Sequence, residues 1–485
     1  MYRSPRPSQL RVAGALIWAS VCVFAACALG DADRGARAEG LETRSAWQRT
    51  RQGWLLRAPD PGDAVLGPKI GPVATKKKPM YALAYHYDAR VFDTARDKAR
   101  VIGSVRRGTL LSAAKQVRGK GCRRGIWYAL KGIGYACTRD GFLVSNKPPQ
   151  LPMRQLAPAL DAALPFQYAR VIVDGALRFV RIPHADELSV IASRLAAAEA
   201  GSERVKLPNV VQAQMVGDYF VALDRVEGPS QQPYYRTVRG RYVRVGDIEP
   251  RAAPKMQGVL LSGARALPYA FVYGEDDAPL LKLADDDVRP AGRAEVHARF
   301  AVKKPAPSAH PELVSAPHNV YVPRDRVRIA RRIARPSDVP RDAKWVHVEL
   351  SEQTLVAYEG DKPVFATLVS TGKEPGHHAT PTGLYRIRDK RVTVTMSGDD
   401  PVDGHYEVAE VPWTQFYNEG YALHGAYWHD TFGKTRSHGC TNLSPPDARW
   451  LFQWTLPRVP KGMHALRGEG TYVYFTRTSS TSGSG

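Results

Sequence analysis

The chain is predicted to be mostly β and divided into several domains. At 485 residues it is too long for one ordinary hydrophobic core. Hydrophobic residues make up 44% and charged residues 24%, a composition that builds packed cores rather than remaining disordered. From about residue 80 onward, short apolar and β-branched runs are punctuated by glycine, which is typical of closely spaced strands.

The first 29 residues have the pattern of a secretory signal peptide. Arg3, Arg6 and Arg11 precede an apolar run from Val12 to Leu29, and small residues lie near the end of that run. We therefore expect the protein to be exported to the periplasm or the cell envelope.

Three fates remain open for this signal. In the first, ordinary cleavage follows Ala28 or Gly30. In the second, the segment 24–27 acts as a lipoprotein cleavage box, which it resembles except for an uncommon Phe24, and Cys27 carries a lipid anchor. In the third, the apolar run stays as an uncleaved anchor, since its length is near the lower limit for spanning a bilayer.

The net charge of +22 comes from 69 Lys and Arg against 47 Asp and Glu. Such an excess favours polyanionic surroundings such as an anionic membrane surface or a cell wall. A genome rich in G and C, which favours Arg, Ala and Pro, explains the same excess without a partner. No basic block with interleaved aromatics resembles a nucleic-acid groove, so we expect no nucleic-acid partner.

Composition divides the upstream chain into three parts. Residues 30–79, rich in Arg, Gly, Pro and Ala, are predicted to be a flexible linker. Residues 80–146 are predicted to form a small β barrel and weakly resemble bacterial SH3-like domains. Residues 147–335 contain a helical stretch at 186–200 and echoes of the segment 132–136, so we expect one or two further SH3-like units there.

The cysteines suggest one disulfide and one reactive thiol. Cys122 and Cys137 lie close together within the predicted 80–146 domain, and Cys440 stands alone. In an oxidising compartment, a close pair and an odd cysteine indicate a Cys122–Cys137 bridge and a free Cys440.

The last domain is predicted at residues 343–475, followed by a disordered Ser/Gly-rich tail at 476–485. Segments 345–350, 354–358 and 364–369 have strand patterns, with a hairpin turn before the last of them. Ser444-Pro445-Pro446-Asp447 predicts the start of a short helix with Ser444 as its N-cap.

The chemistry is concentrated in two segments, 421–426 and 437–442. A thiol attacks carbonyls as thiolate, so Cys440 needs a base nearby. His438 lies two residues away and would point roughly parallel to the thiol on an extended strand. His424, on a preceding segment, would meet the sulfur if the two segments pair. Gly439 allows a tight turn, and the amides of Gly439 and Cys440 can then point at a developing oxyanion.

Here the sequence resembles the L,D-transpeptidase (YkuD-type) family. The resemblance rests on the motif Ser-His-Gly-Cys-x-Asn at 437–442 with the upstream pair His424-Gly425. It extends to three further segments: Val346-x-Val348-x-Leu350-x-x-Gln353, Ser370-Thr371-Gly372 and Thr380-Pro381-Thr382-Gly383. Thr441 departs from the family pattern, which usually has an aliphatic residue or Arg there.

The resemblance implies a fold, a reaction and roles for named residues. It implies Cys440 as nucleophile, His424 as base, the Gly425 carbonyl orienting the imidazole, and Ser437, His438 and Asn442 supporting the loop. Cys440 would attack the carbonyl of the L-centre of diaminopimelate in a peptidoglycan tetrapeptide stem and release D-Ala. The acyl group would pass to an amine of a second stem or of a protein. No metal or cofactor is implied, and carbapenems are expected as covalent inhibitors.

Three other interpretations compete with this one. Cys440 can be an inert buried residue, as most lone cysteines are. His424, His429, His438 and Cys440 are acceptable zinc ligands, although they lack compact ligand pairs. The whole chain can be a non-catalytic wall-binding scaffold with a vestigial catalytic domain. The complete set of motif residues favours the enzyme.

Overall fold

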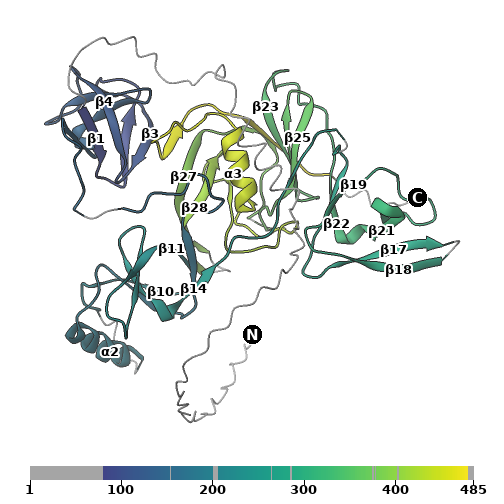
Figure 1. The fold of residues 1–485 in the computed structure, drawn as a ribbon, viewed down its shortest axis with the longest axis horizontal. Helices are drawn as coiled ribbons and strands as arrows, with labels where there is room; N and C mark the ends of the chain where they lie inside the picture. The colour runs from purple at the N-terminus through teal and green to yellow at the C-terminus, as the bar shows by residue number, and fades with distance from the viewer. Residues whose placement is uncertain are drawn as a thin grey trace, which may run out of the picture. The chain divides into compact units, whose positions relative to one another are not determined.

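The computed structural model describes residues 80–152, 155–199, 206–263, 265–284, 287–373, 376, 378–400 and 404–478 (Figure 1). The predicted signal peptide, Cys27 and the linker at 30–79 lie outside these ranges, as does the tail beyond residue 478. The described residues are mostly in strands and include the α-helices α2 (Ala185–Glu199) and α3 (Pro445–Trp454), which confirms the predicted mostly-β fold. Neither helix is long and apolar enough to cross a membrane.

The first β domain contains the seven strands β1 (Met80–Ala84), β2 (Asp88–Phe92), β3 (Val101–Arg106), β4 (Leu110–Val117), β5 (Trp127–Leu130), β6 (Gly134–Cys137) and β7 (Phe142–Ser145). They pair in the order β7-β1-β4-β5-β6-β2-β3. Among the described residues no pairing joins β7 to β3, so the sheet is open where we expected a closed barrel. The outer edge of β3 instead pairs with β31 (Ala465–Arg467) of the last domain.

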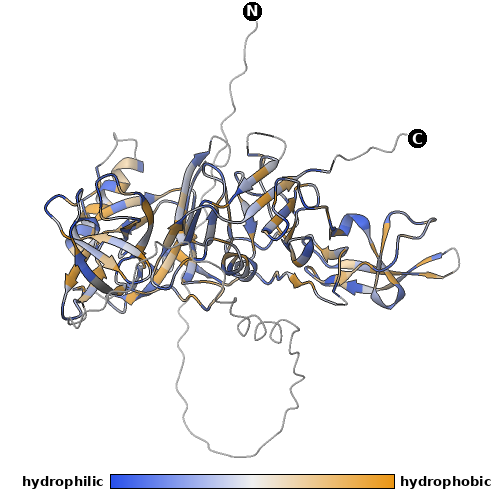
Figure 2. Cartoon of the chain, turned by 90° about the horizontal axis from the view of Figure 1, so that it is seen from above, coloured by the Kyte–Doolittle hydropathy of each residue, from blue (hydrophilic) through white to orange (hydrophobic). Residues whose placement is uncertain are grey.

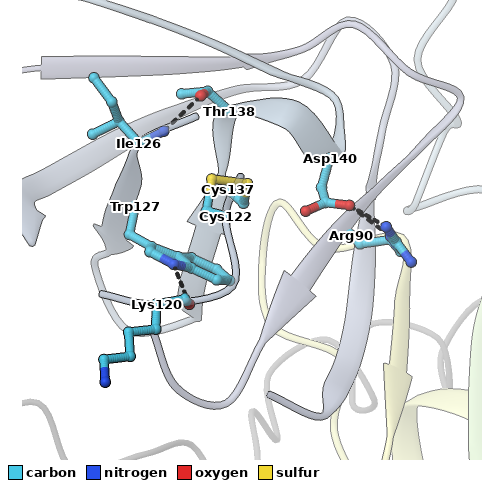
Figure 3. Close-up of a disulfide and its surroundings, with 8 residues drawn as sticks. All are labelled: Arg90, Lys120, Cys122, Ile126, Trp127, Cys137, Thr138 and Asp140. Carbon is cyan, nitrogen blue, oxygen red and sulfur yellow. Dashed lines mark hydrogen bonds and ion pairs between the residues drawn. A yellow bond between two sulfur atoms is a disulfide. The ribbon is translucent and has the colours of Figure 1, made fainter. Parts of the chain in front are cut away.

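A disulfide joins Cys122 to Cys137 beside the small cluster around Trp127 (Figure 3). The indole Nε1 of Trp127 donates to the carbonyl of Lys120 at 3.0 Å, and its ring packs edge-on against Phe92. The disulfide and this indole contact tie the loop that precedes β5 to the sheet.

The middle β domain, defined here as residues 166–251, has its own core. Its strands are β8 (Gln167–Val171), β9 (Ala176–Phe179), β10 (Val211–Met215), β11 (Asp218–Glu227), β12 (Tyr234–Thr237), β13 (Tyr242–Arg244) and β14 (Ile248–Arg251). Helix α2 packs Ile191 against Phe179 and Tyr234 of this sheet. The predicted helix at 186–200 therefore agrees with α2 to within one residue.

The next region, residues 259–330, forms two small sheets and contributes one short strand to a sheet of the last domain. β16 (Tyr269–Val272) pairs with β19 (Arg299–Ala301) and β22 (Val327–Ala330). β17 (Ala278–Ala284) pairs with β18 (Asp287–Ala294) and β21 (Val320–Pro323), which pairs in turn with β20 (Leu313–Ala316). The two-residue β15 (Val259–Leu260) pairs with the last domain.

The segment 132–136 and its echoes at 240–243 and 319–322 share one local structure. Each runs from a strand through a three-residue 3-10 turn into another strand. The turns lie at Thr138–Asp140, Val245–Asp247 and Arg324–Arg326, between β6 and β7, β13 and β14, and β21 and β22. The similarity seen in the sequence therefore corresponds to a recurring strand–turn–strand unit.

The last domain has two sheets and helix α3. One sheet contains β23 (Lys344–Glu349), β24 (Thr354–Glu359), β25 (Lys362–Leu368), β26 (Gly383–Arg386) and β32 (Tyr472–Thr476), in the order β25-β24-β23-β32-β26. The other contains β27 (Asp389–Asp400), β28 (Gly404–Phe416), β29 (Ala422–Gly425), β30 (Thr441–Leu443) and β31. In Figure 2 hydrophobic segments, coloured orange, lie in strands throughout the described chain.

Two local features of this domain differ from expectation. β27 and β28 form a long hairpin that is not among the strands predicted above at 345–350, 354–358 and 364–369. Pro412 and the left-handed backbone of Glu410 and Trp413 interrupt the strand pattern of β28 and hid it from sequence analysis. Ser444 occupies the N-cap position of α3 but makes no side-chain capping bond.

Candidate active site

Cys440 lies in a tight loop immediately before β30. Gly439 has φ +114°, and a Cβ atom on it would lie 2.2 Å from Cε1 of Tyr421. No other residue fits both the left-handed backbone and this contact. The glycine of the motif is therefore required by the shape of the loop that presents the thiol.

Thr380 holds this loop in place. Its hydroxyl donates to the carbonyl of Gly439 at 2.8 Å and accepts from the amide of Gly372 at 2.9 Å. Gly372 in turn lies so close to the carbonyl of His378 that a Cβ atom would come within 1.8 Å of it. The motifs at 370–372 and 380–383 are thus the supports of the cysteine loop.

Gln353, the residue directly before β24, supports the same loop. Its amide nitrogen donates to the carbonyl of Leu350 at 2.7 Å, and its amide oxygen accepts from the backbone of Thr371 at 2.8 Å. The carbonyl of Thr371 then accepts from the backbone amides of Arg436 and Ser437. A continuous hydrogen-bond path therefore runs from Gln353 to the residues just before Cys440.

The strand pairing predicted to bring His424 to the cysteine segment is present. β29 and β30 pair in parallel, with His424 opposite Asn442. The imidazole is 2% exposed, and its Nδ1 lies 3.4 Å from the carbonyl oxygen of Gly425, a long contact. Burial lowers the pKa of His424 to about 4, although the Gly425 contact acts in the opposite direction. The imidazole is therefore neutral at pH 7 and able to accept a proton.

The thiol of Cys440 is the one free cysteine among the described residues. Burial raises its pKa to about 11, while a backbone hydrogen bond from Ala422 acts the other way. Its Sγ lies 3.6 Å from the carbonyl oxygen of Gly420. The resting site therefore holds a neutral thiol and a neutral imidazole, so a proton must leave the sulfur as it attacks.

Ser437 organises the turn through its hydroxyl. The Oγ donates to the carbonyl of Cys440 at 2.5 Å and accepts from the amide of Gly439 at 3.1 Å. In this conformation the Gly439 amide is engaged by Ser437, so it does not serve as the oxyanion donor expected from the sequence.

His429 is buried and contacts Asn442. Burial lowers its pKa to about 3, so the ring is neutral. The amide of Thr431 donates to Nδ1 at 3.3 Å, which assigns the ring proton to Nε2. The amide nitrogen Nδ2 of Asn442 lies 2.9 Å from Nε2 of His429. Asn442 also lines the pocket, so His429 packs behind a pocket residue.

The ring of His438 packs against the β27–β28 hairpin. Its ring stacks on Tyr406, with centroids 4.9 Å apart, and meets the ring of His378 edge-on at 4.6 Å. His378 is also ion-paired with Asp400 at 2.8 Å. The end of the hairpin is therefore tied to the loop that carries Cys440.

His378, Asp400 and His438 are also the group that can hold a metal ion. Their ligand atoms lie within 4.8 Å of one another, and two imidazoles with one carboxylate are acceptable zinc ligands. Within the described part of the chain this is the one such group. His424, His429, His438 and Cys440, the zinc set considered from the sequence, do not converge.

A pocket of about 370 Å³ surrounds the thiol. Its lining contains five of the predicted site residues: His424, Ser437, His438, Cys440 and Asn442. Trp428, Lys373 and Arg436 also line it, and so do Asp218 and Phe220 of the middle β domain. Nothing in the sequence near 218 signals a site, because these two residues reach the pocket only through tertiary pairing.

Comparison with known proteins gives the same assignment for the last domain. The family model of the YkuD L,D-transpeptidase catalytic domain matches residues 343–473. The Bacillus subtilis protein named "Putative L,D-transpeptidase YciB" is 26% identical over 128 residues, which are 24% of this chain and 63% of that protein. This chain therefore spans less than two thirds of that curated relative.

Solved structures with similar regions include two of an L,D-transpeptidase from Enterococcus faecium. An Enterococcus faecium L,D-transpeptidase is 24% identical and covers 28% of this chain and 50% of its own, with a TM-score of 0.23. Its catalytic domain acylated by ertapenem is 23% identical and covers 28% and 98%, with a TM-score of 0.23. Given the family match and the motif residues assembled around the pocket, residues 343–473 belong to the YkuD family of L,D-transpeptidase catalytic domains.

Proposed function

We propose that this protein is a peptidoglycan L,D-transpeptidase with Cys440 as nucleophile and His424 as base. The observation that carries the proposal is a free thiol and a buried neutral imidazole lining one pocket, within a YkuD-type domain. A vestigial domain would not need the intact supports that Gln353 and Thr380 give to the cysteine loop.

The first half-reaction forms a thioester. The Cys440 sulfur adds to the carbonyl carbon of the L-centre of diaminopimelate in a tetrapeptide stem while His424 takes the thiol proton. The tetrahedral intermediate collapses, the bond to D-Ala breaks, and the imidazolium gives its proton to the departing amine. Because burial disfavours both charged forms at rest, the thiol proton passes to His424 only as the sulfur attacks the carbonyl.

The second half-reaction transfers the acyl group to an amine. The neutral amine of a second stem, or of an envelope protein, attacks the thioester carbonyl, and an amide bond replaces the carbon–sulfur bond. His424 accepts the proton from the amine and returns it to the sulfur. The protein's residues alone supply both steps, without a metal.

A carbapenem tests the nucleophile directly, because its strained lactam carbonyl acylates an activated thiol. Intact-mass measurement should show one adduct on the wild-type protein and none on Cys440→Ala, which should also lack turnover of a tetrapeptide stem. Glu249→Gln, at an exposed residue that does not line the pocket, serves as a control that should still form the adduct. An adduct that persists on Cys440→Ala would show that another residue is the nucleophile.

The pH dependence of acylation separates His424 from His438. With the pKa of His424 near 4, the base is neutral above that pH, so the acylation rate should fall only as pH drops through about 4. His424→Ala should slow acylation by roughly a hundredfold to ten-thousandfold and remove this acid limb. His438→Ala should keep the limb and lower thermal stability, since its ring packs against Tyr406. Loss of the limb in His438→Ala with a stable fold would reverse the two roles.

The site of action follows from the substrate. Cross-linked peptidoglycan lies outside the cytoplasmic membrane, and the predicted signal at 1–29 would deliver the enzyme there. N-terminal sequencing of the protein from its native envelope should find a start between Cys27 and Asp33. A chain that starts at Met1 and fractionates with the cytoplasm would contradict export.

A further inference from the structure

The middle β domain reaches the pocket through strand β11. Residues 218–220 of β11 pair in parallel with residues 406–408 of β28, with Asp218 opposite Tyr406 and Phe220 opposite Val408. Successive side chains of a strand alternate between its two faces. All four of these residues line the pocket around Cys440, whereas Tyr219 belongs to the core of the middle domain.

We propose that the middle β domain is part of the active site. Asp218 receives the amine of the acyl acceptor in its ammonium form, which loses one proton to solvent before the neutral amine attacks, and Phe220 acts as a positioning residue for Trp428 and His424. This inference rests on the proposed transpeptidase function and deepens it, because it assigns the acceptor side of the pocket to residues outside the catalytic domain.

Phe220 supports the base through one intervening ring. Its side chain is 7% exposed and lies 6.4 Å, between ring centroids, from Trp428. The Trp428 ring lies 5.7 Å from that of His424. Phe220 therefore backs the indole that packs beside the base, and its removal would open this wall to water.

The attachment of β11 to the hairpin is rigid enough for such a role. Arg178 of β9 makes two hydrogen bonds to the carboxylate of Glu407, at 2.5 and 3.2 Å. Tyr168 of β8 stacks on Tyr427 at 3.9 Å and donates to the backbone carbonyl of Glu410 at 2.8 Å. Aromatic packing and charged bonds thus fix the middle domain against the same hairpin whose residues line the pocket.

Asp218 is the one carboxylate among the residues that line the pocket. The Lys and Arg residues that line the pocket, Lys373 and Arg436, are both cationic. Asp218 has an ion pair with Arg170 at 3.1 Å, but both side chains are more than half exposed, so water screens the pair and an incoming ammonium group can exchange with it. A carboxylate here selects an amine-bearing acceptor over a neutral or acidic one.

The two half-reactions allow Asp218 to be tested alone. Asp218→Asn should raise the KM for a diaminopimelate-containing acceptor stem about fivefold to tenfold and should change the rate of carbapenem acylation by much less. Glu249→Gln is the matched control, because Glu249 is a similarly exposed, ion-paired carboxylate of the same domain that does not line the pocket. An unchanged acceptor KM in Asp218→Asn would overturn this assignment.

Phe220 is tested in the first half-reaction. Phe220→Ala should lower the maximal acylation rate by roughly tenfold or more while changing the carbapenem's binding constant less, and Phe220→Leu should restore most of the rate. Phe179→Ala, in the separate core under α2, controls for general loss of domain stability and should keep the maximal rate. Equal effects of Phe220→Ala and Phe179→Ala would reduce Phe220 to a structural residue.

The wild-type protein separates failure of this inference from failure of the proposed function. If it forms no carbapenem adduct and transfers no acyl group, the transpeptidase assignment is wrong. If it does both and the two variants behave like their controls, the middle domain has no part in the site.

Discussion

The two sheets of the catalytic domain are attached to the rest of the chain in different ways. The sheet of β27–β31 carries His424 and Asn442, and it pairs with β3 of the first domain and β11 of the middle domain. Among the described upstream residues, the sheet of β23–β26 and β32 pairs only with the two-residue β15. The upstream domains are therefore joined mainly to the sheet that forms the pocket.

The chemistry of the two attachments differs as well. On the pocket side, the fully buried carboxylate of Glu410 binds Arg106 at 2.9 Å, Arg239 at 2.8 Å and the hydroxyl of Tyr87. These partners come from the first and middle domains. On the other side, an apolar cluster joins the sheet to region 259–330 through residues such as Tyr269 and Trp345, and the ion pair of Glu352 with Arg324 lies at a partly exposed position. Charged bonds require a specific geometry, whereas apolar packing tolerates small displacements.

The largest effect is expected from breaking the charged attachment. Glu410→Ala leaves Arg106, whose side chain is 6% exposed, buried without its carboxylate, so the free energy of unfolding should fall by about 3–5 kcal/mol. Denaturant unfolding of the full chain measures it. Glu469→Ala is the control on the other sheet, because Glu469 pairs with Arg386 but is 79% exposed, and it should change stability by about 1 kcal/mol or less. Equal losses of unfolding free energy in the two variants would show that the ion pairs of Glu410 stabilise the fold no more than an exposed pair does.

Acid should weaken the same attachment without mutation. Burial alone would raise the pKa of Glu410, but Arg106 and Arg239 lower it from 4.5 to about 2. A depressed pKa stabilises the fold above the unfolded value, and this contribution is lost as pH falls from about 4.5 through 2. The loss should be about 3 kcal/mol. Unfolding of wild type and Glu410→Gln across this range should converge toward pH 2, and a constant difference would contradict the shift.

The apolar side should respond less and without pH dependence. The hydroxyl of Tyr358 accepts from the backbone amide of Ile333 at 3.2 Å, and its ring stacks on Trp345 at 4.1 Å. Tyr358→Phe keeps the stacked ring and removes one neutral hydrogen bond, so we expect a loss of about 1 kcal/mol at any pH between 3 and 8. A loss as large as that of Glu410→Ala would erase the contrast between the two sides.

Metal removal should have no effect on the pocket side. The proposed chemistry needs no ion, so dialysis against EDTA should leave carbapenem acylation unchanged. A fall in rate that zinc restores in wild type, but not in Asp400→Asn, would make His378, Asp400 and His438 a functional metal site.

Local patterns predicted the elements whose residues interact within a short stretch of chain. Strands β23 to β25, helix α3 and helix α2 each lie within one or two residues of their predicted bounds. Hairpin turns, helix periodicity and prolines at helix starts act over fewer than about ten residues, so one sequence displays them. The strand β28 was missed because its one proline, Pro412, and its left-handed residues break the local pattern, and only pairing with β27 restores it.

The candidate site divides in the same way. Sequence analysis found five residues that the structure places around one pocket: His424, Ser437, His438, Cys440 and Asn442. Asp218 and Phe220 were not found, nor was the buried position of His429. The sequence of a strand does not identify a pairing partner in another domain. The partner of β11 lies almost 190 residues away along the chain.

The sequence by itself determined the catalytic domain, its family, the nucleophile and base to be tested, and the mostly-β character of the chain. Those properties reside in short motifs whose residue types are required by chemistry and by tight turns, as Gly439 is. The tertiary structure alone decided that the first sheet stays open at β3, that Glu410 joins three domains, and that the middle domain lines the pocket. Each of these depends on the free edge of a strand or on a buried charge finding a distant partner, and unpaired backbone groups and unpaired buried charges are what folding must satisfy.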